Sequence, residues 1–322
     1  MRLIIKERKI PIIIHQLQAL LRRLPVNHPK RPMIEEDLAK RLAGYRGEQS
    51  LDYHLRFLDQ DQYKIFHDLR LINQDAFQID VLLLSSYFVL LLEVKNISGT
   101  LFFDKYSNQL IRTLDGIETG FSNPVSQVKR QTLQFQNWLE KNKYKNLPVE
   151  YLIIISNPST VLKKNPGNHQ LFKRVVHSEL LMDRIKDFEL IYKNEQLEKK
   201  DLRKLSKLLL QANIPLHQDI FQYYNLTPDQ LILGVQCPSC RYAPMERAFA
   251  RWYCTKCQTS NKDAHIQVIN DYFYLIKRTI TNRECQQFLK ISSRNIAHTL
   301  LTSMNLPTTG SKKSTQYHQQ PQ

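Results

Sequence analysis

The sequence contains no apolar run of about twenty residues, the length that a helix needs to cross a membrane. The longest candidate, Val81–Leu92, is bounded by Asp80 and Glu93 well inside that length. Near the start, the short apolar stretch Ile10–Ile14 contains Pro11 and lacks a small-residue cleavage site, so we find no secretory signal. We therefore expect a soluble, cytoplasmic protein with no membrane partner.

Acidic residues are scarce relative to basic ones. The chain has 30 Asp and Glu against 46 Lys and Arg, a formal net charge of +16 over 322 residues. Because the basic residues are spread over segments with the pattern of folded elements, this surplus favours nucleic acid over a membrane as the partner. A merely basic surface is the alternative, and charge alone does not decide between them.

A phosphate-binding loop of the form G-x-x-x-x-G-K-[ST] is also missing from the sequence. Its absence excludes an NTP-driven motor within this chain. Any helicase or ATPase would have to be a separate partner protein.

Only five cysteines are present, and four of them form two C-x2-C pairs separated by thirteen residues: Cys237 and Cys240, then Cys254 and Cys257. Two-residue spacing lets a tight turn direct both thiolates of a pair at one ion, and the segment between the pairs is long enough for a hairpin. Disulfides are the poorer explanation in a chain without a secretion signal. The pattern predicts a structural Zn²⁺ site that resembles a zinc ribbon. Four ligands close the tetrahedron, so this zinc is not expected to be catalytic, and Cys285 is expected to be a buried helix residue.

Two apolar runs of strand length mark the centre of the chain. Val81–Leu84 and Tyr87–Leu92 are separated by Ser85 and Ser86 and predict two strands buried on both faces of a mixed sheet. Around them the pattern predicts a helix, a first strand, a hairpin, a second helix and a closing strand, at residues 34–58, 63–71, 100–113, from 123 onward, and 149–156. We therefore expect an α/β fold.

Charged residues stand at the ends of these two central strands. Asp80 precedes the first run, and Glu93, Val94 and Lys95 follow the second. Strand side chains alternate between faces, so Glu93 and Lys95 share a face, and a hairpin would bring Asp80 beside them. Two carboxylates and an ammonium group would then meet at one edge of the sheet. An isolated E-x-K triplet is more often a structural ion cluster or an exposed strand end.

The order of motifs around this edge resembles the NERD family, the nuclease-related domain of the PD-(D/E)XK superfamily, over roughly residues 40–160. The matching motifs are Arg46-Gly47-Glu48-Gln49, Asp80, Glu93-Val94-Lys95-Asn96-Ile97-Ser98-Gly99, and Asn123-Pro124-x-x-Gln127. The resemblance implies a restriction-endonuclease-like mixed sheet flanked by helices. It also implies a metal-dependent nuclease that acts on nucleic acid, DNA rather than RNA.

The same resemblance implies roles for individual residues. Ile79 stands where the motif's name has proline, a position at which many relatives vary. Asp80, Glu93 and the Val94 carbonyl would bind Mg²⁺ or Mn²⁺, oxygen ligands that suit a hard ion. Lys95 would orient or help deprotonate the attacking water. Glu48 would hold a second ion or a water, and Gln127 would position Lys95 or the phosphate.

The C-terminal residues predict a further nucleic-acid module. Thr281–Glu284 reads as a helix N-cap, a turn follows at residues 291–295, and a second helix follows the turn. This order resembles a helix-turn-helix or winged-helix DNA reader, although a plain two-helix hairpin remains open. The residues expected to contact DNA are Arg294, Asn295, His298, Lys312 and Lys313.

Five segments are expected along the chain: an N-terminal helical extension (1–36), the nuclease-like domain (37–160), a helical connector (161–231), the zinc ribbon (232–262) and the helix-turn-helix-like segment (263–322). The competing hypothesis is a non-enzymatic DNA-binding or regulatory protein built on a degenerate nuclease fold.

Overall fold

The structure is a computed structural model that describes residues 3–216 and 218–320. These residues fall into two compact units. The first, which we call the sheet unit, consists of residues 3–8 and 42–216. The second, the cysteine unit, consists of residues 9–41 and 218–320. No helix in the described part of the chain is long and apolar enough to span a bilayer.

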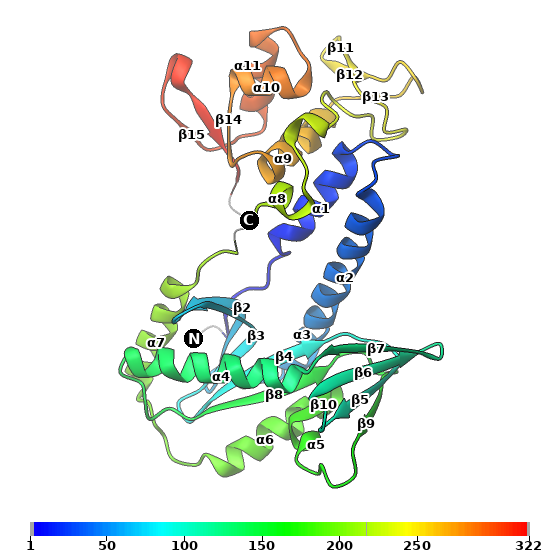
Figure 1. The fold of residues 1–322 in the computed structure, drawn as a ribbon. Helices are drawn as coiled ribbons and strands as arrows, with labels where there is room; N and C mark the ends of the chain where they lie inside the picture. Colours follow the sequence, from blue (N-terminus) through cyan, green and yellow to red (C-terminus); the bar gives the residue numbers. More distant parts are fainter. Residues whose placement is uncertain (1–2, 217, 321–322) are drawn as a thin grey trace. The chain divides into compact units, whose positions relative to one another are not determined.

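A six-stranded mixed sheet forms the centre of the sheet unit (Figure 1). The neighbours β2, β3 and β4 are antiparallel, whereas β8 and β10 run parallel to β4, and β1 runs parallel to β2. The predicted mixed sheet of an α/β fold is therefore confirmed. In sheet order the strands are β1 (Ile4–Lys6), β2 (Lys64–Ile72), β3 (Ala76–Leu84), β4 (Val89–Lys95), β8 (Val149–Ile155) and β10 (Val175–His177).

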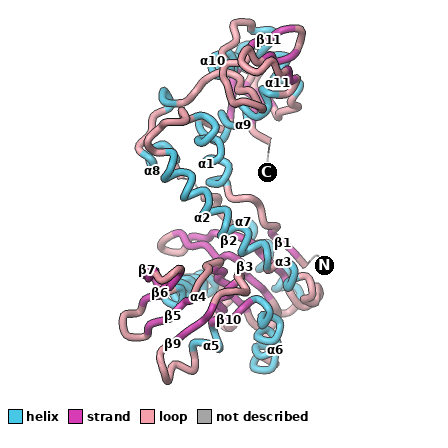
Figure 2. Tube along the Cα trace, turned by 90° about the vertical axis from the view of Figure 1, so that its right-hand side faces the viewer, coloured by secondary structure: helices cyan, strands magenta, loops and turns pink. Residues whose placement is uncertain are grey.

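Helices cover both faces of this sheet (Figure 2). Along β4, Leu90 and Leu92 belong to the apolar cluster on one face, whereas Leu91 belongs to the cluster on the other. Period-two alternation within the apolar run 89–92 of this strand produces these two cores. The first face is covered by α3 (Asp52–Leu55), which follows α2 (Arg31–Ser50), and by α6 (Leu181–Ile191). The second is covered by α4 (Pro124–Lys141) and α7 (Lys199–Ala212).

A second, four-stranded sheet packs beside the first, in the order β7-β6-β5-β9. It holds the predicted hairpin, β5 (Thr100–Asp104) with β6 (Gln109–Leu114), and adds β7 (Ile117–Ser122) and β9 (Val161–Lys164). The segment 161–231 was expected to be a helical connector. It also contains two strands, β9 and β10, and each pairs in parallel with a strand of one of the two sheets. Its helical elements are α5 (Leu171–Arg174), η1 (Ser178–Leu180), α6, α7, α8 (Ile220–Tyr224) and η2 (Pro228–Gln230).

The cysteine unit joins residues from both ends of the chain. A buried ion pair links α1 (Ile12–Arg23) to α9 (Ala264–Leu275): Arg23 Nε donates to Asp271 Oδ2 at 2.7 Å, and Arg22 binds the other oxygen of Asp271. Two small sheets complete the unit. The first consists of β11 (Glu246–Ala248), β12 (Arg251–Tyr253) and β13 (Ser260–Asn261). The second has the order β14 (Thr279–Thr281), β16 (Gln316–His318) and β15 (Thr308–Thr309).

The expected helix pair is present in this unit as α10 (Asn282–Leu289) and α11 (Arg294–Ser303). Thr281 caps α10 and forms the predicted capping box with Glu284, and Cys285 is buried as expected. The two compact units are larger than the five predicted segments, and the limits of those segments stay predictions.

Candidate functional site

The central hairpin of the sheet unit opens at the residues that the sequence singled out. Backbone pairing between β3 and β4 runs from Leu84 with Val89 to Val81 with Leu92 and stops there. Beyond this point Val94 N–H donates to the side chain of Asp80, at 2.8 Å from Oδ2. The Asp80 carboxylate thus accepts a hydrogen bond from a backbone N–H that no longer pairs with β3. This hydrogen bond holds the carboxylate beside β4.

A break in side-chain alternation on β3 directs Asp80 toward this position. Ile79 packs in one apolar cluster and Val81 in the other, so the two-residue period slips by one at Asp80. Opposite it on β2, Asp68 has a left-handed backbone with φ 51°, and neither residue appears in the ladder that pairs their neighbours. A paired irregularity of this kind re-aims side chains at the edge of a sheet.

Glu93 is almost fully buried, with 3% of its surface exposed. Its Oε1 accepts from Lys95 Nζ at 2.6 Å and from Gln127 Nε2 at 2.7 Å, and its Oε2 accepts from Gln131 Nε2 at 3.2 Å. Lys95 Nζ also donates to Gln127 Oε1 at 3.1 Å. Strand β4 and helix α4 therefore hold the acid, the amine and two amides in one network.

Helix α4 reaches this network because of how it begins. The Asn123 side chain accepts from Val125 N–H as the N-cap, and Pro124 occupies the first turn, where its missing N–H costs no hydrogen bond. Gln127 and Gln131 then lie one turn apart on the same face. The resemblance implied a role for Gln127 alone. Gln131, which also binds the Gln78 carbonyl at 2.9 Å, was missed as a ligand of Glu93, although its four-residue spacing from Gln127 pointed to it.

Helix α2 approaches the same edge of the sheet at Gly47. A Cβ atom added there would lie 2.5 Å from Cβ of Asn96 and 2.8 Å from Oγ of Ser156, so only glycine fits. Asn96 in turn donates to the Ala43 carbonyl at 2.8 Å. This close contact between the helix and the end of β4 places the next residue, Glu48, at the site.

Glu48 is held by a residue to which the sequence assigned no function. Arg8, almost fully buried, binds Glu48 Oε2 at 2.7 Å and Asp52 Oδ1 at 3.0 Å. Its guanidinium also lies 2.8 Å from Nδ1 of His67; because arginine can only donate, that nitrogen is unprotonated. Burial, followed by the charge of Arg8, lowers the pKa of His67 to about 4, so the ring is neutral near pH 7. No sequence motif points to Arg8, which lies far from Glu48 along the chain.

The electrostatics of the acids are dominated by burial. Loss of water raises the pKa of Glu48 to about 7; Arg8 opposes this rise, and the charges of Asp68 and Glu93 add to it. Burial, then the negative charges of Glu93 and Glu48, hold the pKa of Asp80 well above its ordinary value, against the Val94 N–H and the charge of Lys95. These shifts mean that the carboxylates lie within electrostatic reach of one another.

The donor set suits a hard divalent cation. Asp80, Glu93 and the Val94 carbonyl offer oxygen atoms only, and a cation would relieve the repulsion that raises the pKa of Asp80. The acids are less tightly gathered than the cysteines. We compared the His, Cys, Asp and Glu side chains of residues 3–216 and 218–320. Among these residues, the four cysteines are the group of three or more whose ligand atoms lie within 4.8 Å of one another.

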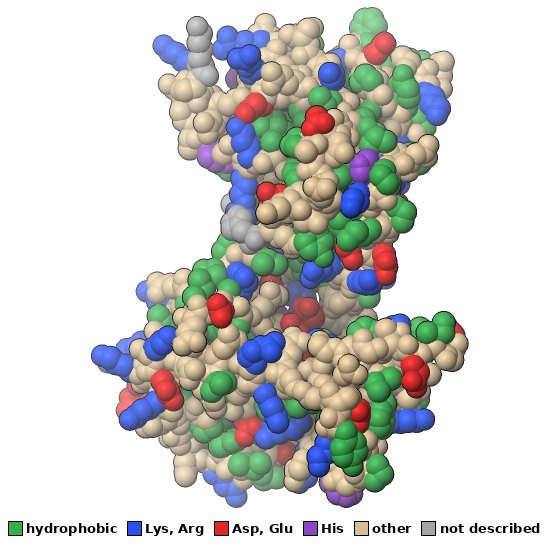
Figure 3. Space-filling model, viewed as in Figure 1, with side chains coloured by type: hydrophobic (Ala, Val, Ile, Leu, Met, Phe, Trp, Pro, Cys, Tyr) green, Lys and Arg blue, Asp and Glu red, His purple; other side chains and the backbone are tan. Residues whose placement is uncertain are grey.

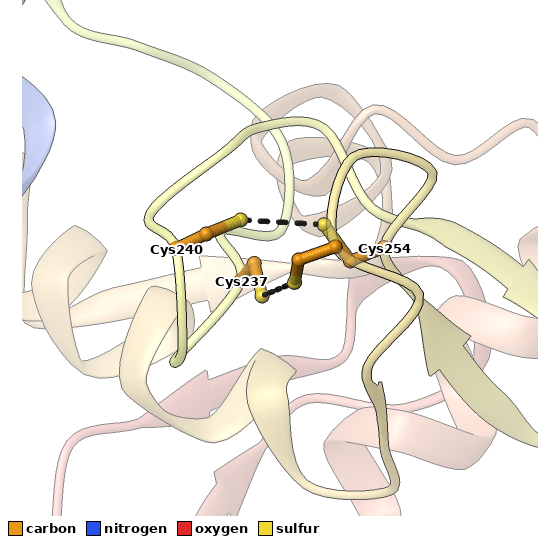
Figure 4. A group of neighbouring side chains, drawn as sticks. Cys237, Cys240 and Cys254 are labelled. Carbon is orange, nitrogen blue, oxygen red and sulfur yellow. Dashed lines mark hydrogen bonds between the residues drawn. The ribbon is translucent and has the colours of Figure 1, made fainter.

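The four cysteines of the second unit point toward one another (Figure 4). Cys237 Sγ lies 3.6 Å from Cys257 Sγ, and Cys240 Sγ lies 3.5 Å from Cys254 Sγ. Tetrahedral coordination with Zn–S bonds of about 2.3 Å requires sulfur atoms about 3.8 Å apart, so the cluster has the size of a zinc site.

The two cysteine turns have the same backbone geometry. Cys237 N–H donates to the Tyr242 carbonyl at 2.8 Å, and Cys254 N–H donates to the Thr259 carbonyl at 2.9 Å. The residue after each pair, Arg241 and Gln258, is left-handed, with φ 60° and 62°. This repeated turn lets both thiolates of each pair face the same point, as the C-x2-C spacing predicted.

The residues expected to contact DNA lie in the cysteine unit and not at the acidic site. Arg294, Asn295 and His298 are exposed on α11, where Ser293 is the N-cap and His298 Nδ1 lies 3.0 Å from the Tyr317 hydroxyl. Lys312 is exposed in η3 (Lys312–Ser314), between β15 and β16, and the side chain of Lys313 lies outside the described part of the chain. On the face shown in Figure 3, Lys and Arg side chains are scattered among acidic ones.

Comparison with known proteins bears on the sheet unit. Residues 43–156 match the family model described as "Nuclease-related domain", NERD, which covers the site from Glu48 to Gln127. No curated protein and no solved structure matches the chain.

Proposed function

We propose that this protein, whose residues 43–156 match the model of the nuclease-related (NERD) domain, is a metal-dependent nuclease that hydrolyses phosphodiester bonds in DNA. One observation supports the proposal most directly: Asp80, Glu93 and Lys95 meet at the open end of the central hairpin. There Lys95 Nζ lies 2.6 Å from Glu93 Oε1. Fold alone would not carry it, because function resides in the site.

The chain's own residues divide the work. Asp80, Glu93 and the Val94 carbonyl would hold the cation, Mg²⁺ or Mn²⁺. A bound divalent ion lowers the pKa of water and polarises the scissile phosphate. Lys95 places a positive charge beside Glu93, where it would orient the attacking water and stabilise negative charge on the phosphoryl oxygens.

Two further residues hold this geometry. Gln127 donates to Glu93 and accepts from Lys95, so it fixes both groups without carrying charge. Glu48, whose pKa burial raises to about 7, would bind a second ion or a water. In the cysteine unit, a structural Zn²⁺ on Cys237, Cys240, Cys254 and Cys257 would maintain an accessory module for nucleic acid, to which Arg294, Asn295, His298 and Lys312 belong.

The test is a cleavage assay with the full chain on single- and double-stranded DNA and RNA, with Mg²⁺ or Mn²⁺ varied. Asp80→Ala should abolish cleavage, and Lys95→Ala should slow it by about 10²–10³-fold, the usual effect of removing one group that stabilises transition-state charge. Both variants should bind DNA nearly as tightly as the wild type. Lys186→Ala, which removes an exposed lysine on α6, is the matched control and should cleave normally.

A non-enzymatic DNA-binding protein on a degenerate nuclease fold is the second candidate. It is favoured by one observation: the donors on Glu93 satisfy its charge with protein groups alone. If the wild-type chain binds DNA but leaves every substrate of the panel intact across all metal conditions, this second candidate replaces the first.

A further inference from the structure

The tip of the β11–β12 hairpin is the most unusual turn in the cysteine unit. Ala248 pairs with Arg251, so the loop between the strands has only two residues, Phe249 and Ala250. Both are left-handed, with φ 46° and 59°. A two-residue turn with positive φ at both positions is normally built from Asn-Gly or Gly-Gly, because any other side chain is strained there.

Phe249 does not use its side chain for packing. It is 100% exposed, the highest value among the large apolar residues of the described chain. A scattered exposed apolar residue is ordinary on a protein surface. An aromatic ring held fully in solvent on a backbone conformation that disfavours it calls for a different explanation, because neither the fold of the turn nor the core benefits from it.

The hairpin that carries the ring is firmly anchored. Trp252, on the strand that follows the turn, is fully buried, and its Nε1 donates to His265 at 3.2 Å. Arg247, across from it, stacks on the indole with its guanidinium 5.0 Å from the ring centroid. Cys254 of the metal cluster follows β12 directly. The ring therefore projects from a rigid support, which reduces the entropy lost when it meets a ligand.

The charge of the segment that carries the turn indicates the class of ligand. Between Cys237 and Lys262 the sequence has the basic residues Arg241, Arg247, Arg251, Lys256 and Lys262, with Glu246 as the one acidic residue. Arg251, next to the turn, is exposed and uses Nε for Ser260 Oγ at 3.0 Å. A single ring is too small for a stable protein interface, which buries about 800 Å² on each partner. A flat ring beside cationic groups instead matches a nucleobase beside its phosphates.

We infer that Phe249 is a stacking site for an unpaired base of a single-stranded nucleic acid, with the basic residues of the hairpin beside the backbone. The base must be unpaired or at a frayed end, because a base inside a duplex is already stacked on both faces. This inference rests on the proposal that the chain acts on nucleic acid. It adds a preference for single-stranded segments, which the acidic site does not specify.

The experiment measures binding by the full, zinc-loaded chain without added Mg²⁺, so that cleavage does not consume the probe. The probes are a single-stranded oligodeoxynucleotide with one 2-aminopurine and a blunt duplex of the same length. Phe249→Ala should weaken single-strand binding by roughly 5- to 150-fold, the range measured for the loss of one base–aromatic stack. It should also reduce 2-aminopurine quenching, leave duplex binding unchanged, and leave the salt dependence unchanged because no charge is removed.

Three further variants separate stacking from structure. Phe249→Tyr should retain binding, because the ring remains. Phe249→Asn suits the turn better and should bind as weakly as Phe249→Ala while melting no lower than the wild type. Ala250→Gly relaxes the same turn but keeps the ring, and should bind like the wild type.

The outcomes are distinguishable. If the wild type binds the single strand and Phe249→Ala binds and quenches equally well, the stacking site is refuted and the proposed nuclease function is unaffected. If the wild type binds neither probe, the stacking site and the nucleic-acid function both fail.

Discussion

Replacing Glu48 by Gln should make the sheet unit more stable at alkaline pH and almost unchanged at acidic pH. Folding raises the pKa of Glu48 from 4.5 to about 7, chiefly through burial. The folded state therefore holds this proton more tightly than the unfolded state, so the stability from the protonated carboxyl is present below about pH 4.5 and is lost as the pH rises through about 7. The difference, 7 − 4.5 = 2.5 units at about 1.36 kcal/mol each, comes to about 3 kcal/mol.

The measurement is urea unfolding at about pH 5 and about pH 8, without divalent cations. The sequence has two tryptophans, and Trp138 lies on α4 in the sheet unit, so a Trp252→Phe background makes fluorescence report this unit alone. Glu48→Gln should exceed its parent in unfolding free energy by about 2.5 kcal/mol more at the higher pH than at the lower one, because pH 5 already lies slightly above the unfolded pKa. Glu48→Gln also removes one of the charges that raise the pKa of Asp80, so the titration of Asp80 changes the comparison in the same direction.

Glu140→Gln, an exposed substitution on α4, is the matched control and should show no such pH-dependent difference. If Glu48→Gln behaves like this control, then Glu48 is not a buried acid coupled to its neighbours. The electrostatic description of the site would then be wrong.

Three further predictions concern the site and the cysteine cluster. Arg8→Ala removes the charge that lowers the pKa of Glu48, so the rising limb of the plot of kcat/KM against pH should move to higher pH. Arg8→Lys should move this limb less. An unchanged plot would show that Arg8 is only structural. Added Mg²⁺ should raise the urea midpoint of the wild type but not that of Asp80→Ala, because only a folded-state ligand stabilises by mass action. Cys254→Ser should release one Zn²⁺ per chain, read with a colorimetric chelator, and lower the melting temperature of the cysteine unit; loss of the thiol without a change in bound zinc would exclude a four-cysteine site.

The part of the site that follows from local periodicity could be predicted from the sequence. Glu93 and Lys95 share a face because strand side chains alternate, and no tertiary information is needed for that statement. Gln127 follows from a helix that begins at Asn123-Pro124. The two cysteine turns are equally local, because each is defined by a two-residue spacing and one left-handed residue.

The remainder depends on long-range or irregular structure. Arg8 reaches Glu48 across 40 residues of sequence, and no spacing rule connects a short N-terminal strand with a helix end. The slip in alternation at Asp68 and Asp80 is a backbone irregularity inside an otherwise regular apolar pattern, so periodicity predicts the strands but not the break. The strands β9 and β10 escaped prediction because each is too short to show a period.

The distribution of charge at the site bears on whether the sheet unit is a working nuclease or a scaffold. Arg8 forms an ion pair with Glu48 and partly opposes the rise in its pKa, and Lys95 forms an ion pair with Glu93. Asp80 accepts a hydrogen bond from a main-chain N–H, and this bond and the charge of Lys95 both lower its pKa. The pKa of Asp80 nevertheless remains well above the ordinary value. A scaffold would gain stability from a neutral side chain at this position, because an unrelieved buried carboxylate lowers stability at neutral pH. This charge lies on the residue that is bound to the Val94 N–H, where a divalent cation is proposed to bind, and that cation would supply a positive partner for it.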